Sequence, residues 1–256
     1  MGIVGGPLAS RMLARLSPTG EGGLAEGVPK AYENRSKLEV LLGPSIWDAI
    51  RDKAIIDFGC GPGLESVELA EHGARHVLGI DLRELWLKRA AEHARQHGVA
   101  DRCTFAQAWD GRSRADIILS IDSFEHFDDP AAILKIFHEM LKPNGAVLAS
   151  FGPLWYHPYG GHLYSIFPYA HLVFTEKALV EWRSRLPGKG PARSFMDTGL
   201  NQMTIAQFEK VVAESPFRFA SFEAVPIRPL RWAANRLLRE FTTSIVRCRL
   251  EPRTMH

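Results

Sequence analysis

The stretch Ala54-Ile-Ile-Asp-Phe-Gly-Cys-Gly-Pro-Gly63 decides the fold of this chain of 256 residues. Residues 54–59 are a short apolar run that ends in glycine, which is typical of a buried strand. Residues 64–72 have the pattern of a helix. Glycines between a strand and a helix let a ligand approach the backbone closely, and the start of the helix presents free N–H groups. The stretch therefore predicts a ligand-binding turn in an α/β protein.

The alternation of strands and helices continues along the chain. Further strands are expected at residues 76–82, 103–108, 115–122, 146–152, 218–227 and 242–252. Helices are expected at residues 35–51, 83–97, 130–141, 175–186, 204–215 and 229–240. This alternation indicates a parallel sheet with helices on both faces. Polar and apolar residues alternate in the last strand, which favours a half-exposed edge position for it.

Three helix starts carry capping signals. Asp129 precedes Pro130, so an N-cap is followed by proline in the first turn. Thr204 and Gln207 have the spacing of a capping box, and Thr175 is expected to cap the helix that follows it. These signals fix where three of the predicted helices begin.

Composition divides the chain into four parts. Residues 1–29 are rich in glycine and proline, which favours a flexible N-terminal arm over the short amphipathic helix that Leu8 to Leu16 would allow. Residues 30–152 form the expected cofactor-binding core, and residues 204–256 complete its sheet. The strand–helix alternation stops between them, so residues 153–203 are predicted to be a cap inserted after the fifth strand.

The glycine loop does not have the spacing of a dinucleotide site. Such a site needs its third glycine at position 64, where this chain has leucine. Asp57 precedes the loop, and its carboxylate would repel a pyrophosphate but attract a cationic amino acid. Asp81 ends the next strand, where a carboxylate can accept hydrogen bonds from both hydroxyls of a ribose.

An acid, three closely spaced glycines and a second acid after the next strand resemble the class I S-adenosylmethionine-dependent methyltransferases. The resemblance covers residues 50–152 and includes the runs from Ser120 to Pro130 and from Leu141 to Gly145. These runs are similar to the small-molecule, type 11-like branch, which includes quinone-biosynthesis enzymes. The resemblance implies a Rossmann-like, doubly wound, seven-stranded sheet that is mostly parallel, with the last strand antiparallel. It also implies S-adenosylmethionine as cofactor.

The resemblance assigns cofactor roles by position. Asp57 would hold the methionine amine, and Asp81 would bind the ribose while Leu82 packs on the adenine. The family usually has Gly-Asp-Ala after the third strand, but this chain reads Gln107-Ala-Trp109-Asp110, so either Asp110 or Trp109 would contact the adenine. The remaining cofactor-binding candidates are Gly59, Cys60, Gly61, Gly63 and Ser120.

The predicted cap is rich in aromatic residues and histidines. Residues 151–174 contain four of the five tyrosines and three of the ten histidines. An aromatic segment after a strand, at the carboxyl edge of the sheet, is suited to a small-molecule pocket. The substrate-binding candidates are Trp155, Tyr156, Tyr159 and Tyr164. The alternative is an aromatic core within the cap itself.

The cap histidines are the candidates for a general base. We rank His162 ahead of His157 and His171, and the responsible residue is expected to titrate near pH 6–7. Their spacing is not that of a standard zinc site, so no metal is predicted. The pair Glu125-His126 follows the fourth strand and is interpreted as a local packing feature.

Composition limits the class of partner. Lys plus Arg is 31 and Asp plus Glu is 29, so the net charge of +2 gives no broad surface for nucleic acid. Three cysteines are too few for a disulfide framework, which favours a cytoplasmic protein. No segment is apolar enough for stable insertion into a membrane. The sequence does not determine the oligomeric state.

The sequence therefore predicts a methyltransferase acting on a small, partly aromatic or apolar acceptor, with O-methylation preferred over N-methylation. One alternative is a quinone or lipid methyltransferase that works at a membrane surface, because residues 226–256 carry seven arginines against two glutamates. The other alternative is a non-catalytic binding module with the same fold.

Overall fold

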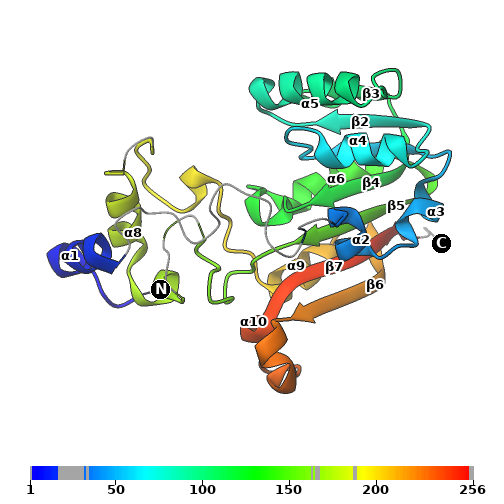
Figure 1. The fold of residues 1–256 in the computed structure, drawn as a ribbon. Coiled ribbons are helices and arrows are strands. Elements are labelled where there is room, and N and C mark those ends of the chain that lie inside the picture. Colours follow the sequence, from blue (N-terminus) through cyan, green and yellow to red (C-terminus); the bar gives the residue numbers. More distant parts are fainter. Residues whose placement is uncertain are drawn as a thin grey trace.

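The computed structural model of the chain describes residues 2–16, 32, 35–162, 164, 168–186 and 189–253, and it contains one seven-stranded sheet (Figure 1). The spatial order of the strands is β3-β2-β1-β4-β5-β7-β6, and β7 is antiparallel to both of its neighbours. This order confirms the predicted doubly wound sheet with an antiparallel last strand. The strands are β1 (Ala54–Phe58), β2 (His76–Ile80), β3 (Cys103–Ala106), β4 (Ala115–Ile121), β5 (Leu141–Phe151), β6 (Phe217–Pro226) and β7 (Thr243–Pro252).

Helices cover both faces of the sheet, and each covered face has its own apolar core. On one face lie α2 (Lys37–Leu42), α3 (Ile46–Ile50), α4 (Leu64–Glu71) and α5 (Glu84–Gln96). On the other face lie α6 (Pro130–Met140) and α9 (Ile205–Ala213). β1 and β4 are buried on both sides, which explains why their sequences are continuous apolar runs instead of alternating ones.

The predicted helix starts are confirmed by their hydrogen bonds. The Asp129 side chain accepts from the backbone N–H of Ala132 at the start of α6. Thr204 and Gln207 form both bonds of a capping box at the start of α9. The Thr175 side chain accepts from the backbone N–H of Ala178 at the start of α8 (Glu176–Arg183). Short-range capping chemistry was therefore sufficient to place these three boundaries.

Three element predictions are wrong. β7 is not at the edge, because β6 pairs with its outer side, and the alternation in β7 reflects a sheet face with only partial helix cover. The helix expected at residues 35–51 is interrupted between α2 and α3, where Gly43 has a φ of 85° and precedes proline. The helix expected at residues 229–240 is a 3-10 helix η4 (Arg228–Ala233) followed by a short α10 (Arg239–Thr242).

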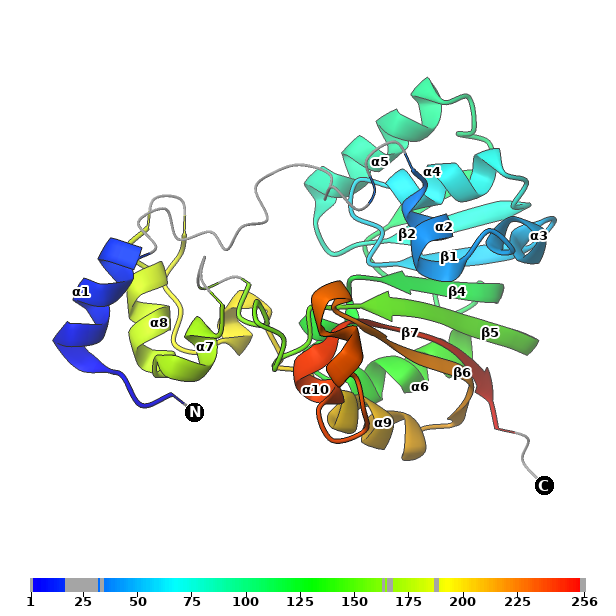
Figure 2. The same cartoon turned by 60° about the horizontal axis from the view of Figure 1, so that its bottom comes forward.

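The cap lies beyond the carboxyl ends of the parallel strands, to one side of the sheet (Figure 2). It contains α7 (Ala170–Val173), α8 and a 3-10 turn η3 (Met196–Thr198). Its apolar core is separate from the two cores of the sheet and includes the side chains of Trp155, Tyr164, Phe174, Leu179 and Phe195.

The N-terminal segment joins this cap, so the prediction of a flexible arm is wrong for part of residues 1–29. Residues Gly6–Leu16 form a helix, α1, which packs against α8 and buries Ala9 and Leu13 in the cap core. Val4 pairs with Phe174 in a short parallel bridge. The rest of the predicted arm, from residue 17 to residue 29, lies outside the described residues.

The two ends of the cap meet at η2 (Phe124–His126), the turn that follows β4. Where the chain enters the cap, the backbone N–H of Gly152 donates to Glu125 Oε1 (3.2 Å). Where it returns, the backbone N–H of Asn201 donates to the Glu125 carbonyl (3.0 Å). The Asn201 side chain also donates to the carbonyls of Phe124 (2.6 Å) and Phe127 (2.9 Å). The cap is thus anchored at the carboxyl end of the parallel strands.

Within the described ranges, no helix combines the length and the hydropathy required to cross a bilayer.

Candidate active site

The glycine loop has the backbone geometry that a closely bound ligand requires. Gly59, Gly61 and Gly63 all have positive φ values, of 88°, 51° and 78°. A Cβ on Gly59 would lie 2.4 Å from Ser123 Oγ, and one on Gly63 would lie 2.6 Å from the Ala90 Cβ. A Cβ on Gly61 would meet nothing within 4 Å, so this residue faces open space. Two glycines therefore allow the loop to pack, and the third leaves room beside it.

Asp57 is the acid before the loop, and it is almost completely buried. Its Oδ2 accepts a hydrogen bond from the Ser66 hydroxyl (2.5 Å) at the start of α4. Burial, with a smaller contribution from the charge of Glu65, raises the pKa of Asp57 to about 7. A buried carboxyl with a raised pKa binds a cation strongly when it ionises, as the role predicted for Asp57 requires.

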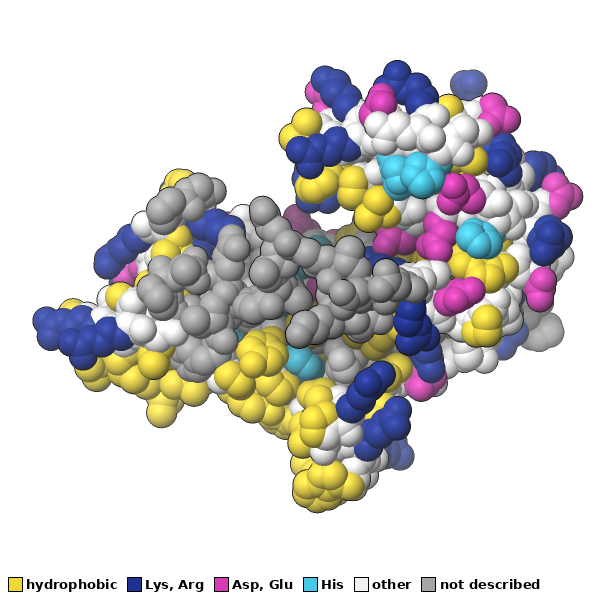
Figure 3. All heavy atoms as spheres, viewed as in Figure 1, with side chains coloured by type: hydrophobic (Ala, Val, Ile, Leu, Met, Phe, Trp, Pro, Cys, Tyr) yellow, Lys and Arg dark blue, Asp and Glu magenta, His cyan; other side chains and the backbone are white. Residues whose placement is uncertain are grey.

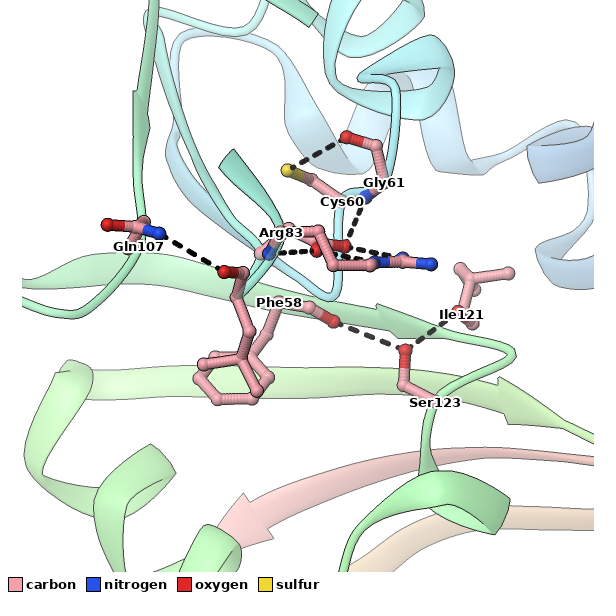
Figure 4. Close-up of polar contacts among 9 residues, drawn as sticks. Phe58, Cys60, Gly61, Arg83, Gln107, Ile121 and Ser123 are labelled. Carbon is pink, nitrogen blue, oxygen red and sulfur yellow. Dashed lines mark hydrogen bonds and ion pairs between the residues drawn. The ribbon is translucent and has the colours of Figure 1, made fainter. Parts of the chain in front are cut away.

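Asp81, the acid expected to bind ribose, is already engaged by Arg83 (Figure 4). The Arg83 guanidinium donates from Nε to Oδ1 and from Nη2 to Oδ2, both at 2.9 Å. The backbone N–H of Gly61 donates to Oδ2 at 3.0 Å. Burial alone would raise the pKa of Asp81, but these bonds outweigh it and lower the pKa below its ordinary value. The sequence analysis missed Arg83, although an arginine two residues after the acid was a visible signal.

The two candidates for the adenine contact after the third strand, Asp110 and Trp109, are hydrogen-bonded within one loop. The Asp110 carboxylate closes its own loop by accepting from Arg112 N, Ser113 N and Ser113 Oγ, and these bonds lower the pKa of Asp110 to about 2. Trp109 Nε1 donates to the Ser113 carbonyl in the same loop. The polar groups of both side chains are thus used within the loop, and the contact of either one with the adenine stays a prediction. Gln107 instead donates to the Leu82 carbonyl, which ties the second and third strand ends together (Figure 4).

Two other cofactor candidates have clear positions. Leu82 is 84% exposed beside Asp81, as expected of an apolar side chain that a flat ring would cover. Ser120 is completely buried within β4, so the structure does not place it in contact with a ligand. Ser123, at the end of the same strand, lies against the loop and donates to the Ile121 carbonyl. Cys60 is buried, and burial raises the pKa of its thiol above the ordinary value.

A charged cluster beside the loop was not predicted. Lys37, from α2, lies 2.9 Å from Glu65 Oε1 and 3.0 Å from Asp122 Oδ2. Burial alone would lower the pKa of Lys37, but the two carboxylates outweigh it and raise the pKa. A cavity of about 620 Å³ opens here, and its lining includes Lys37, Leu64, Glu65 and Asp122. Lys37 thus offsets the negative charge that accumulates near Asp57.

The four aromatic residues predicted to bind the substrate differ in their exposure. Trp155 and Tyr164 are buried in the cap core, and the Tyr164 hydroxyl is hydrogen-bonded to Thr198, so neither presents a surface to a substrate. This outcome matches the alternative of an aromatic core within the cap. Tyr159 is exposed and Tyr156 is half-buried against the Phe241 ring, with a centroid distance of 5.0 Å. Only these two retain accessible surface for a substrate.

The three cap histidines differ in what their rings can do. His171 is buried, and its Nε2 bonds the Trp155 carbonyl. His157 Nδ1 accepts from the backbone N–H of Tyr159, so the neutral ring carries its proton on Nε2 and is a donor. His162 Nδ1 is buried without a partner among the described residues. Burial lowers the pKa of each to about 4, below the expected pH 6–7.

The pair Glu125-His126, interpreted as a packing feature, separates into two roles. Glu125 is buried, and burial raises its pKa to about 8. Its hydrogen bonds join the two ends of the cap, as a packing role requires. His126 is exposed, and its Nδ1 bonds the Gly199 carbonyl (2.5 Å). A carbonyl can only accept, so Nδ1 carries the proton and Nε2 is a free acceptor. Its ring lies 5.7 Å from that of His162.

The comparisons with known proteins agree with this geometry. The family model described as "Methyltransferase domain" matches residues 25–198. The ubiquinone biosynthesis O-methyltransferase of Neisseria meningitidis is 30% identical over 158 residues, which are 59% of this chain and 65% of that protein. The protein of the same name from Idiomarina loihiensis is 36% identical over 107 residues, 40% of this chain and 44% of its own length. This chain thus spans less than two thirds of these curated relatives.

Solved structures show the same fold at low sequence identity. An S-adenosylmethionine-dependent methyltransferase from Listeria monocytogenes superposes with a TM-score of 0.53 and 17% identity, covering 81% of this chain and 96% of that one. The sheet order, the glycine loop and the two acids define a class I S-adenosylmethionine-dependent methyltransferase. The chain belongs to the family of the methyltransferase domain, whose methyl donor is S-adenosylmethionine.

The residues present fit this cofactor. A carboxylate is buried where the amine would bind, open space faces Gly61, and the exposed Leu82 follows the ribose acid. Asp57, the glycine loop, Asp81 and Leu82 would hold the cofactor, which supplies an electrophilic methyl group when bound. Asp81 can accept hydrogen bonds from the ribose hydroxyls only if these bonds are added to, or replace, the hydrogen bonds from Arg83.

Proposed function

We propose that this methyltransferase transfers the methyl group to a hydroxyl of a small, partly aromatic or apolar acceptor. The observation that carries the proposal is His126, an exposed residue in the turn η2 after β4, whose Nε2 is a free hydrogen-bond acceptor. A hydroxyl must lose its proton as its oxygen is methylated, whereas a neutral amine can attack unaided. A base with its lone pair available is therefore more useful for O-methylation than for N-methylation.

The surroundings of His126 support this role. The bond from Nδ1 to the Gly199 carbonyl fixes the orientation of the ring as well as its tautomer. His126 replaces the cap histidines as our first candidate for the base, because His171 is buried and His157 presents a donor. His162 remains a neighbour of His126 within the same site. The partly accessible Tyr156 and Tyr159 supply aromatic surface for the acceptor.

The reaction then follows from position and proton removal. His126 Nε2 takes the hydroxyl proton while the oxygen forms a bond to the methyl carbon, and the carbon–sulfur bond of the donor breaks. General-base catalysis of this kind contributes typically about 10²–10⁴-fold in rate, and orientation of the two reactants contributes the rest. The two relatives named above are O-methyltransferases of ubiquinone biosynthesis, which agrees with transfer to an oxygen atom.

The class of acceptor can be tested by a screen of matched pairs. Purified protein and S-adenosylmethionine would be incubated with phenols and catechols carrying short apolar tails, and with the anilines of the same shape. Mass spectrometry would detect the methylated products. We expect methylation of hydroxyl compounds only. Turnover of the anilines alone would refute the preference for oxygen, and no methylation of any compound would refute the proposed acceptor class.

The base can be tested by His126→Asn. The asparagine amide can still donate to the Gly199 carbonyl in place of Nδ1, but the variant has nothing in place of Nε2. We expect kcat to fall by about 10²–10⁴-fold while the cofactor Kd stays within a few-fold. His162→Gln and His157→Gln are the matched controls, and each is expected to retain most of its turnover. Wild-type kcat in His126→Asn would exclude His126 as the base.

A further inference from the structure

The segment from η4 to α10 exposes several large apolar side chains. Trp232 is 86% exposed and Leu237 is 89% exposed, and Leu238 and Phe241 are partly exposed beside them. Burial of this apolar surface against the rest of the chain would stabilise the fold. Its exposure to water therefore indicates that an external partner covers it. The indole of Trp232 is of a kind that prefers the boundary between water and lipid.

The helix α1 has a second exposed apolar stripe. Ala9 and Leu13 face α8, but Leu8, Met12 and Leu16 are at least partly exposed. At 100° per residue these three lie within an arc of 80° on the helix, so they form one continuous stripe. Arg11 and Arg15 border the side of the stripe that is away from α8. α1 is therefore amphipathic on its outer face as well as on its packed face.

Both segments carry arginines that pair with no acid. Arg11, Arg15, Arg228, Arg231 and Arg236 have no ion pair among the described parts of the chain. Arg239 is different, because both of its terminal nitrogens bond the Glu209 carboxylate. α1 contains no acidic residue, and the first acid after Glu223 is Glu240, which caps the backbone of α9. The exposed apolar groups are thus surrounded by uncompensated positive charge.

The two segments lie on the same side of the molecule. Figure 3 shows apolar side chains along the lower edge, under α1 and at the tip of the η4–α10 segment, with basic side chains beside both. The contact between the Tyr156 and Phe241 rings joins the cap to α10, and the backbone N–H of Ile3 donates to the Val173 carbonyl between α1 and α7. We call these exposed apolar side chains and the five unpaired arginines the basic apolar face.

We propose that the basic apolar face docks this enzyme on the surface of a bilayer that contains anionic lipids. Apolar side chains enter the boundary between headgroups and acyl chains, and arginines beside them attract the negative headgroups. A second copy of the chain fits less well, because two such faces would bring ten arginines together. Docking by itself does not depend on the methylation chemistry. Delivery of an apolar acceptor from the bilayer to the adjoining cap rests on the proposed function.

The test is co-sedimentation of the full chain, without cofactor or acceptor, with vesicles of two compositions. One is pure phosphatidylcholine, and the other contains 30% phosphatidylglycerol. We expect binding to the anionic vesicles only, and we expect it to weaken when NaCl is raised from 0.1 to 0.5 M, since screening shortens the range of the attraction. The double variants Trp232→Ser/Leu237→Ser and Arg228→Glu/Arg236→Glu should each lower the affinity about tenfold or more.

The matched control is Leu85→Ser with Arg89→Glu on α5, another exposed pair of an apolar and a basic residue, which lies on the far edge of the sheet. This variant should bind vesicles like the wild type. Thermal melts of all variants must match, since the changed side chains are on the surface. No sedimentation with anionic vesicles, equal binding to neutral vesicles, or an equal loss in the α5 control would each overturn the proposal. Failure of the acceptor screen would leave the vesicle result unaffected.

Discussion

The buried carboxyl of Asp57 should make cofactor binding depend strongly on pH. Burial and the nearby charge of Glu65 hold the pKa of Asp57 at about 7 in the free protein, and the cofactor amine needs the ionised form as its partner. Lowering the pH below 7 therefore protonates the group that binds. The α-amino group itself, with a pKa of about 7.7–8.0 in model compounds, stays protonated throughout that range.

The size of the effect follows from the ionised fraction. With a pKa of about 7, Asp57 is ionised in roughly 3% of molecules at pH 5.5 and in roughly half of them at pH 7. The apparent Kd is the intrinsic Kd divided by the competent fraction, so the Kd should fall by about 15-fold between these two pH values. Ionised Asp57 also costs free energy in the unliganded protein, so its stability should decline as the pH rises from about 4 to 7.

Calorimetric titration with S-adenosylhomocysteine measures this dependence, because that ligand has the amine but no sulfonium charge. The Asp57→Asn variant should bind more weakly at pH 7 and show no slope between pH 5.5 and pH 7. Asp81→Asn is the control, because it should weaken binding yet retain the slope of the wild type. A wild-type Kd that does not change between these pH values would refute the assignment of Asp57 to the amine.

Three further predictions follow from individual contacts. Arg83→Met should tighten cofactor binding by about 2–5-fold, because it frees the buried Asp81 carboxylate from an ion pair whose guanidinium is exposed. Arg89→Met should change nothing, and weaker binding of Arg83→Met would mean that Arg83 orients the acid. Glu125→Gln should raise the melting temperature more at pH 9 than at pH 6, because burial raises the pKa to about 8 and the wild type therefore loses stability as the pH rises from about 4.5 to about 8; an equal change at both pH values would contradict this. Asn201→Ala should speed proteolysis of the cap, since two partly buried carbonyls lose their donor at a cost of up to about 1–3 kcal/mol, and unchanged cleavage would contradict its anchoring role.

The elements and caps that were predicted correctly depend on local patterns. The apolar run before Gly59 and the capping box at Thr204 are each contained within a few residues, so the sequence alone indicates them. The position of β7 is different. Its alternation of polar and apolar residues depends on how much of each face of the sheet is covered. Many arrangements of neighbouring strands produce the same alternation. The interior place of β7 was therefore beyond prediction from its own residues.

The parts of the site that were missed depend on contacts between distant segments. The tautomer of His126 is set by Gly199, 73 residues away, and no local pattern reports that bond. Likewise, Trp155 and Tyr164 are buried partly because α1 packs in the same cap core, although it precedes them by more than 130 residues. The sequence shows which residues of the cap have aromatic or imidazole rings. Only the packing determines which of them remain accessible.

The hydrogen bonds that join both ends of the cap to Glu125 make the cap a separable module. The chain leaves β5 at Gly152 and returns at Asn201 within reach of a single residue, and Trp155 N also bonds Met203 O where the two paths run side by side. A change in the length of the intervening segment therefore shifts no register in the sheet. We expect an exchange of this segment between related enzymes to leave the strand pairing of the sheet as it is and, on the proposed function, to change the acceptor preference.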